Sequence, residues 1–134
     1  RQISYSFLVV NGLINTYETY QANINMTNNT FNSNYASQFG TIFSSKSLRQ
    51  STSYMNVVNN TFTNNKCPQN GGVYSFILTD YTVFGANNRY VNNSAGQAGG
   101  VAYGFRASFA LFEEGSYYES NLLRDFRRVA KSFI

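Results

Sequence analysis

Apolar and aromatic positions recur along this 134-residue chain with a period of about 28 residues. An aromatic column is formed by Phe31, Phe62, Tyr90 and Tyr118. A glycine column at Gly12, Gly40, Gly71 and Gly99 is followed two residues later by an aliphatic column at Ile14, Ile42, Val73 and Val101. The columns divide the chain into units 12–39, 40–70, 71–98 and 99–126, with partial units at both ends. A period of this length is typical of solenoids and other repeat architectures.

The pattern inside each unit predicts strands. Segments 73–77 and 81–84 are short, rich in β-branched and aromatic residues, and bounded by Gly or Asn-Asn. No helical period is found before residue 120. One unit is too polar to bury its apolar residues alone, but stacked units complete a continuous core. We therefore predict an all-β fold, a single-domain parallel β-helix with coils of about 28 residues and between four and five coils. The aromatic and aliphatic columns form its stacked core.

An asparagine column follows the aromatic one at a distance of three residues. Its members are Asn34, Asn65, Asn93 and Asn121. Asparagine tolerates the left-handed backbone conformation and hydrogen-bonds nearby backbone groups, so it suits a corner between strands. When it recurs at one corner of every coil, its amide can bond to the amides above and below. The column therefore predicts a structural ladder that needs no ligand.

These motifs resemble the repeat of the polymorphic outer-membrane protein family. The matching elements are Gly71-Gly72-Val73, Gly99-Gly100-Val101, the Phe-x-x-Asn sequences at Phe31 and Phe62, and their tyrosine forms at Tyr90 and Tyr118. The units that begin at Gly12 and Gly40 keep one glycine of the pair. The resemblance runs from about Ile3 to Leu123. It implies a right-handed parallel β-helix, an extracellular or cell-surface location, and a structural or adhesive role within a large secreted or surface protein.

Unit lengths and chain ends add three expectations. The second unit is three residues longer than its neighbours, and the polar stretch Ser44–Ser53 is the expected site of the extra loop. Capping units are missing at both ends, which favours a segment of a longer chain. Residues 122–134 form either a short basic amphipathic helix or the start of a further coil, because Val129 keeps the aliphatic register.

Asparagine and cysteine raise questions of modification. Four asparagines stand in N-glycosylation sequons: Asn25, Asn28, Asn59 and Asn92. Each is either a glycan acceptor or a turn asparagine that happens to precede Thr or Ser. Cys67 is the only cysteine, so the chain has no disulfide framework of its own. Its place in a column with Ala36 and Ala95 predicts a buried, inert thiol.

Charge and composition argue against most chemistry. The net charge is +4, but the basic residues are spread thinly and no nucleic-acid module is present, so we expect no nucleic-acid partner. The six acidic residues fall in different columns, and the chain has no histidine. Carbohydrate-active β-helices need paired carboxylates or a calcium cluster. We therefore expect no catalysis, no cofactor and no metal, and no membrane span in this segment.

Two functional hypotheses remain open. In the first, the chain is a structural or adhesive solenoid whose partners are other segments or copies of the same surface protein. In the second, it is a carbohydrate-binding or carbohydrate-processing β-helix, with exposed tyrosines such as Tyr17, Tyr20, Tyr81 or Tyr117 stacking on sugar rings. Exposed tyrosines aligned on one face favour the second hypothesis. Sequon asparagines on that face favour the first.

Overall fold

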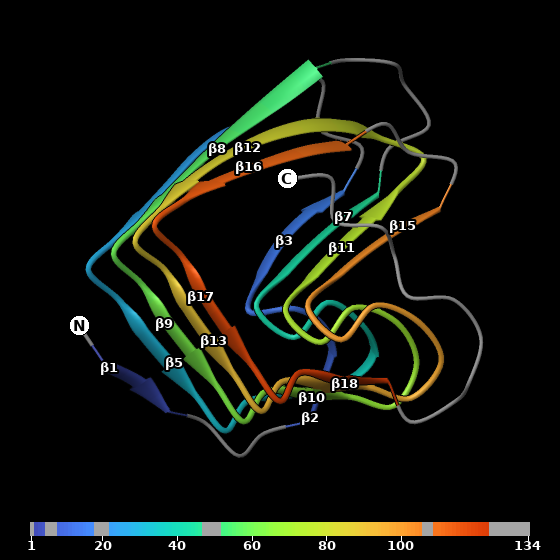
Figure 1. Cartoon of the computed structure of the whole chain (residues 1–134). Helices are drawn as coiled ribbons and strands as arrows, with labels where there is room; N and C mark the ends of the chain where they lie inside the picture. The colour runs from blue at the N-terminus through green and yellow to red at the C-terminus, as the bar shows by residue number, and fades with distance from the viewer. Residues whose placement is uncertain (1, 5–7, 18–21, 47–51, 106–108, 124–134) are drawn as a thin grey trace.

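Four parallel β-sheets wrap around one core in a computed structural model of the chain (Figure 1). The structure describes residues 2–4, 8–17, 22–46, 52–105 and 109–123. Every element within these ranges is a strand, and none is a helix. Each coil contributes one strand to each sheet in turn, and the paired strands of neighbouring coils run parallel. The predicted all-β parallel β-helix is confirmed.

The sheets are named here A to D. Sheet A contains β1 (Gln2–Ser4), β5 (Thr30–Asn32), β9 (Thr61–Thr63), β13 (Arg89–Val91) and β17 (Tyr117–Glu119). Sheet B contains β2 (Leu8–Asn11), β6 (Tyr35–Phe39), β10 (Lys66–Cys67), β14 (Ser94–Ala95) and β18 (Leu122–Leu123). Sheet C contains β3 (Ile14–Tyr17), β7 (Phe43–Lys46), β11 (Tyr74–Ile77) and β15 (Ala102–Phe105). Sheet D contains β4 (Asn23–Thr27), β8 (Thr52–Val58), β12 (Asp80–Ala86) and β16 (Phe109–Glu114).

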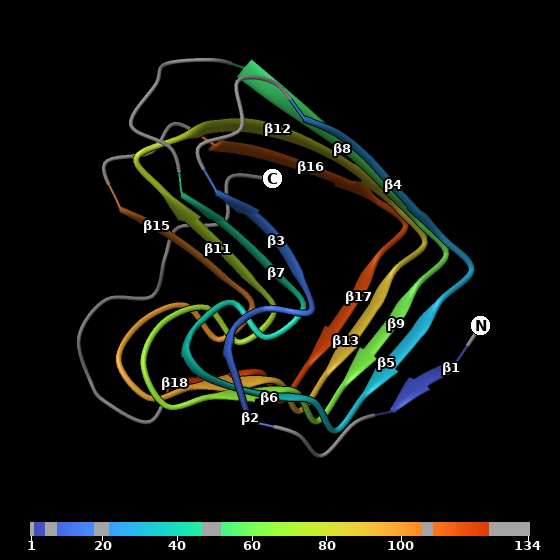
Figure 2. The ribbon, with the colours of Figure 1, turned by 180° about the vertical axis from the view of Figure 1, so that it is seen from behind.

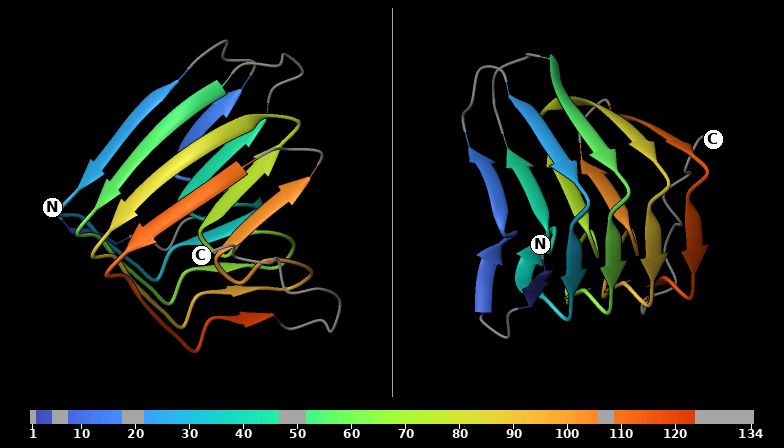
Figure 3. Two further views of the ribbon diagram at one scale, coloured as in Figure 1. Left: turned by 45° about the horizontal axis from the view of Figure 1, so that its top comes forward. Right: turned by 90° about the vertical axis from the view of Figure 1, so that its left-hand side faces the viewer.

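The coil is right-handed. In Figure 1 the chain passes from β3 through β4 and β5 to β6 in a counter-clockwise direction. Figure 3 shows the coils stacked in sequence order along one axis, and the later coils lie on the side nearer the viewer of Figure 1. Seen from behind, the same path runs clockwise (Figure 2). This is the hand that parallel strands and their crossovers strongly prefer.

The strand register reproduces most of the sequence columns. Phe31 pairs with Phe62, Phe62 with Tyr90, and Tyr90 with Tyr118. In sheet D, Ile24 pairs with Met55, and Met55 with Val83. Because paired residues in a parallel sheet lie on the same face, residues of one column stack directly above one another. The 28-residue period therefore measures one turn of the coil.

The first unit departs from the expected register by one residue. Ile14 pairs with Phe43, not with a residue of the Ile42 column, and Phe43 pairs with Tyr74. The pairing of β2 with β6 has a register irregularity between Val9 and Asn11, so the chain enters β3 one residue early. The assignment of Ile14 to the column of Ile42, Val73 and Val101 was wrong. Ile14 still packs against the core, partly buried.

The register also locates the extra residues of the second unit. Lys46 pairs with Ile77, 31 residues on, whereas Thr52 pairs with Asp80, 28 residues on. Three residues are therefore inserted between Lys46 and Thr52, inside the expected stretch Ser44–Ser53. Residues 47–51 themselves lie outside the described residues, as do 124–134, so the structure does not decide between helix and coil for most of the tail.

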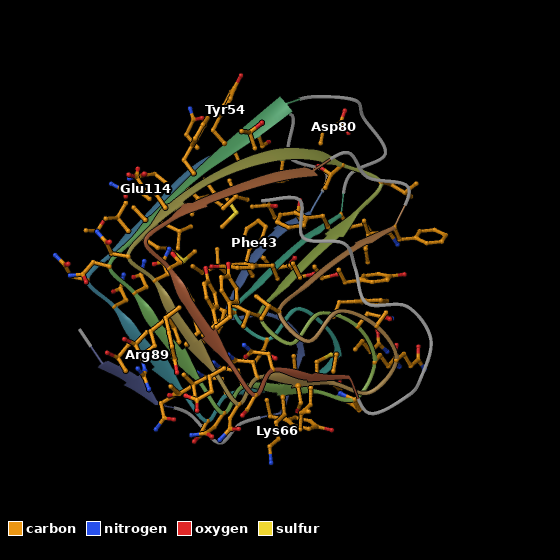
Figure 4. All side chains as sticks on the ribbon, viewed as in Figure 1. Phe43, Tyr54, Lys66, Asp80, Arg89 and Glu114 are labelled. Atoms are coloured by element: carbon orange, nitrogen blue, oxygen red, sulfur yellow. The ribbon has the colours of Figure 1, made fainter. Side chains whose placement is uncertain are left out.

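The core is aromatic and aliphatic and runs along the coil axis. Its largest fully buried side chains include Tyr74, Tyr90, Phe43, Phe62 and Phe76. Phe43 lies inside the coil, whereas Tyr54 and Lys66 project outward from sheets D and B (Figure 4). Sheet C is unusual because both of its faces are covered: Ser44 and Ser75 alternate with core residues along their strands and are nevertheless buried.

Candidate functional site

Two corners of the coil carry most of the buried polar side chains. The first corner joins sheet D to sheet A, and the second joins sheet A to sheet B. At each corner, one residue takes a positive φ and the next turns its side chain inward. The positive-φ residues of the first corner are Asn28, Asn59, Asn87 and Gly115, and those of the second are Ser33, Asn64, Asn92 and Ser120. Asparagine and glycine reach this conformation at low cost, which explains the composition of the corners.

The second corner holds the ladder formed by Asn34, Asn65, Asn93 and Asn121. The Asn34 amide nitrogen donates to Asn65 Oδ1 at 2.9 Å, and the Asn34 backbone N–H donates to the same oxygen at 3.1 Å. The same pair of bonds joins Asn65 to Asn93. Asn93 bonds to Asn121 in the same way. Each ladder amide also donates to a carbonyl of the preceding coil, as Asn93 does to the Phe62 oxygen at 2.9 Å. The ladder therefore satisfies corner backbone groups that no strand pairs.

The first corner holds a second ladder, formed by Asn29, Asn60, Asn88 and Ser116. Asn60 Oδ1 accepts from the Asn29 backbone N–H at 2.9 Å, and Asn88 Oδ1 accepts from the Asn60 backbone N–H at 2.9 Å. Ser116 Oγ accepts from the Asn88 backbone N–H at 3.0 Å. Sequence reasoning missed this ladder. Its signal was present, because these residues stand two places before the aromatic column in every unit.

Between the two ladders the aromatic column forms a continuous stack. Neighbouring rings lie nearly parallel, with centroids 5.1 Å apart for Phe31 and Phe62, 4.9 Å for Phe62 and Tyr90, and 4.7 Å for Tyr90 and Tyr118. The buried Tyr90 hydroxyl lies 2.9 Å from the Tyr74 hydroxyl across the core. Tyr118, in the last described coil, is 44% exposed. Offset stacks of this kind add stability beyond the area that they bury.

The glycine column lies where the chain turns from sheet B to sheet C. Gly40, Gly71 and Gly99 have positive φ values of 42°, 73° and 68°. A Cβ on Gly71 would lie 2.2 Å from the Tyr74 carbonyl oxygen and 3.3 Å from the Ser75 Cβ. The glycines therefore allow this corner to fold against the outer face of sheet C, which explains why the serines there are buried. Ile42 and Val73, two residues further on, are fully buried, and Val101 packs against the core partly buried.

Cys67 lies inside the coil in sheet B. It pairs with Ala95, and its side chain is 2% exposed. Its thiol donates to the Gln38 carbonyl oxygen at 3.1 Å. Burial raises the pKa of the Cys67 thiol, and hydrogen bonds from the Gln69 and Asn70 backbone oppose this shift in part. The thiol is therefore protonated and shielded at neutral pH.

All four sequon asparagines are exposed. Asn25 stands on the outer face of β4, two residues before that strand ends, and Asn28 and Asn59 occupy neighbouring coils of the first corner. Asn92 occupies the second corner. They therefore line sheet A and the adjoining edge of sheet D. Sheets B and C contain no sequon asparagine among their described strands.

Exposed aromatic residues are distributed over all four sheets. They are Tyr35, Tyr54, Phe84, Phe105, Tyr117 and Tyr118. Tyr81, expected as an exposed sugar platform, is 2% exposed, because its ring packs in the core against Phe43 and Phe76. Tyr117 is 49% exposed. The structure says nothing about the side chain of Tyr17, and Tyr20 lies outside the described residues.

Tyr117 belongs to a small charged group on sheet A. Its hydroxyl donates to a Glu119 carboxylate oxygen at 3.0 Å, and the Arg89 guanidinium lies 5.0 Å from its ring centroid. The hydrogen bond to Glu119, assisted by its negative charge, raises the pKa of Tyr117, and Arg89 acts in the opposite direction. Within the described ranges, no three His, Cys, Asp or Glu residues lie close enough together to hold a metal ion. The described part of the chain also contains no helix long and apolar enough to span a membrane.

Comparisons of the chain with protein-family models, with curated proteins and with solved structures give no match. What the molecule can do must therefore be argued from its corners, its core and its outer faces.

Proposed function

We propose that this chain is a rigid structural or adhesive segment of an extracellular or cell-surface protein, acting as a scaffold or contact surface. One observation carries the proposal. At both corners the buried polar side chains bond from coil to coil, as Asn34, Asn65 and Asn93 do. Side chains used in this way fix the distance and rotation between coils. The geometry is that of a stiff rod whose repeated outer faces are available for contact.

The proposed location rests on two supports. The Gly-Gly-aliphatic and Phe-x-x-Asn elements resemble the repeat of polymorphic outer-membrane proteins, a family of surface β-helices. The exposed positions of Asn25, Asn28, Asn59 and Asn92 suit a protein that meets glycosylation enzymes on its way out of a cell. Other segments or copies of the same surface protein are the partners that such a rod would contact.

The proposal is tested by surface labelling of the organism that makes the protein. Antibodies raised against the folded chain should stain intact cells or the extracellular matrix. Staining that appears only after the cells are permeabilised would contradict the proposed location. Rigidity is tested separately by amide hydrogen exchange: the backbone N–H groups of Asn34, Asn65 and Asn93 should exchange slowly and together. Rapid exchange at these amides would contradict the scaffold role.

A carbohydrate-binding role is the second candidate, and the outer face of sheet D supports it. Tyr54 and Phe84 lie on adjacent strands, are 44% and 50% exposed, and are offset by two residues in register, because Tyr54 pairs with Thr82. Asn56, between them in the outward pattern, adds an amide. Aromatic faces beside amides are common in sugar sites. Binding to a panel of polysaccharides, lost together in Tyr54→Ala and Phe84→Ala, would favour this role over the scaffold alone.

A further inference from the structure

The four sequons differ in what their amide nitrogens do. N-glycosylation attaches the sugar to Asn Nδ2, so a glycan fits the folded coil best where Nδ2 has no partner and faces solvent. Asn59 Nδ2 donates to Asn28 Oδ1 at 2.7 Å, and this bond joins two neighbouring coils. A sugar on Asn59 would stand against Asn28, one strand spacing of about 4.8 Å away. Asn59 is therefore a poor place for a glycan in the folded protein.

Asn25 presents the opposite arrangement. Its Oδ1 accepts a hydrogen bond from Thr27 Oγ1 at 3.0 Å and another from Asn56 Nδ2 at 3.1 Å. The sequon hydroxyl and the neighbouring coil thus hold the oxygen. Its Nδ2 makes no hydrogen bond to another described residue. The amide is oriented by its oxygen, and its nitrogen remains available on the exposed face of β4.

Asn92 is the least engaged of the four. It is exposed at the second corner with φ of 56°, and its backbone N–H bonds to the Glu119 carbonyl oxygen at 3.0 Å. Its side chain makes no hydrogen bond to another described residue. The buried neighbour Asn93 carries the ladder, so a substituent on Asn92 leaves the ladder bonds untouched.

We infer that Asn25 and Asn92 are the N-glycan acceptors of the folded solenoid and that Asn59 is not; the inference rests on the proposed passage of the chain through a secretory pathway. The donor is an oligosaccharide joined through C1 of its first sugar to a lipid diphosphate. The Asn Nδ2–C1 bond forms as the C1–oxygen bond to the diphosphate breaks. The lipid diphosphate leaves with that electron pair, and Nδ2 loses one proton. The two glycans stand at opposite ends of sheet A's short strands, which leaves the faces of sheets B and C for contact.

The test is to secrete the chain from a eukaryotic host and to score each sequon in the folded, protease-resistant fraction by mass spectrometry. We expect occupied Asn25 and Asn92 and a largely bare Asn59. Ser94→Ala and Thr27→Val, which keep both asparagines, should each remove one glycan, and Thr61→Val should remove none. Asn28→Gly, which deletes the oxygen that holds Asn59 and keeps a residue suited to positive φ, should raise occupancy at Asn59.

Occupancy of Asn59 equal to that of Asn92 in the folded fraction would overturn the inference, as would unchanged occupancy of Asn59 in Asn28→Gly. Material from the native organism separates this result from the proposed location. Bare asparagines there, with occupied Asn25 and Asn92 in the secreted recombinant chain, would contradict the extracellular proposal and leave the assignment of acceptors standing.

Discussion

The Asn65 side chain uses its whole hydrogen-bonding capacity beside Asn93. Asn65 Nδ2 donates to Asn93 Oδ1 at 2.9 Å and to the Phe31 carbonyl oxygen at 3.1 Å. Asn65 Oδ1 in turn accepts the Asn34 backbone N–H and the Asn34 amide. The residue is fully buried. One side chain thus joins three consecutive coils, and no other residue type offers two donors and one double acceptor in the same shape.

Removing this side chain should weaken the whole stack. Asn65→Ala leaves the Asn34 N–H, the Phe31 carbonyl and Asn93 Oδ1 each without one buried partner. Because an unpaired buried polar group costs about 1–3 kcal/mol, we expect a loss of about 2–4 kcal/mol in the free energy of unfolding. Urea titration followed by far-UV circular dichroism measures it.

The matched control is Asn56→Ala, on the outer face of sheet D. Asn56 bonds one exposed neighbour, Asn25, at 3.1 Å. We expect a change of about 0.5 kcal/mol or less, since exposed pairs of this kind contribute little. Equal losses in the two variants would mean that the ladder contributes nothing special to stability.

The ladder and the aromatic stack were predictable because one residue type is required at each level. A ladder position accepts only a side chain that both donates and accepts at one corner, so asparagine recurs at Asn34, Asn65, Asn93 and Asn121 and the period is visible. The second ladder ends on Ser116, which bonds through a hydroxyl, so its column changes letter. A search for one letter misses a column that keeps its hydrogen-bonding role and changes its residue.

A second prediction concerns the aromatic stack. Phe62 is fully buried and lies between the rings of Phe31 and Tyr90. Phe62→Ala should leave a cavity in the middle of the stack and cost about 3–5 kcal/mol. Phe84→Ala, which removes the same side chain from a position 50% exposed, should cost far less. Thermal unfolding of the two variants compares them, and equal melting temperatures would contradict the described register.

The cover over sheet C was not predictable from residue types. Ser44 and Ser75 have the composition of solvent-facing strand positions, yet both are buried. The Oγ of Ser75 has no hydrogen-bond partner among the described residues. These serines are buried because the glycine corner folds back over them, and that is a property of the path between sheets B and C. The one-residue shift at Ile14 likewise depends on a register irregularity that residue types do not encode.

A third prediction tests that glycine corner. Gly71 has φ of 73°, and a Cβ would approach the Tyr74 carbonyl oxygen to 2.2 Å. Gly71→Ala should therefore cost about 2–4 kcal/mol through backbone strain and the forced shift of a strand. Gly115→Asn is the control: its φ is 62°, the equivalent residues are asparagines, and the nearest atom is the flexible Asn87 Oδ1. We expect it to change stability by about 1 kcal/mol or less. Chemical denaturation measures both, and a tolerated Gly71→Ala would show that this corner can open without cost.

The last prediction concerns Cys67 and pH. Burial raises the pKa of this thiol in the folded chain above its value in the unfolded chain, about 8.5. As pH rises past that value, the unfolded chain releases the thiol proton first. Its share of the stability is therefore complete at neutral pH and is lost as pH rises toward the raised pKa of the folded state.

Cys67→Ala isolates this effect, because alanine already fills the same column at Ala36 and Ala95. The free energy of unfolding, followed from pH 7 to pH 10, should fall more steeply in the parent chain than in the variant. Other groups titrate equally in both, so the difference reports the thiol alone. Alkylation gives an independent measure: the native thiol should react far more slowly than in denaturant, because the thiolate is the reactive form. Parallel pH curves together with rapid native alkylation would place Cys67 at the surface, which the coil register forbids.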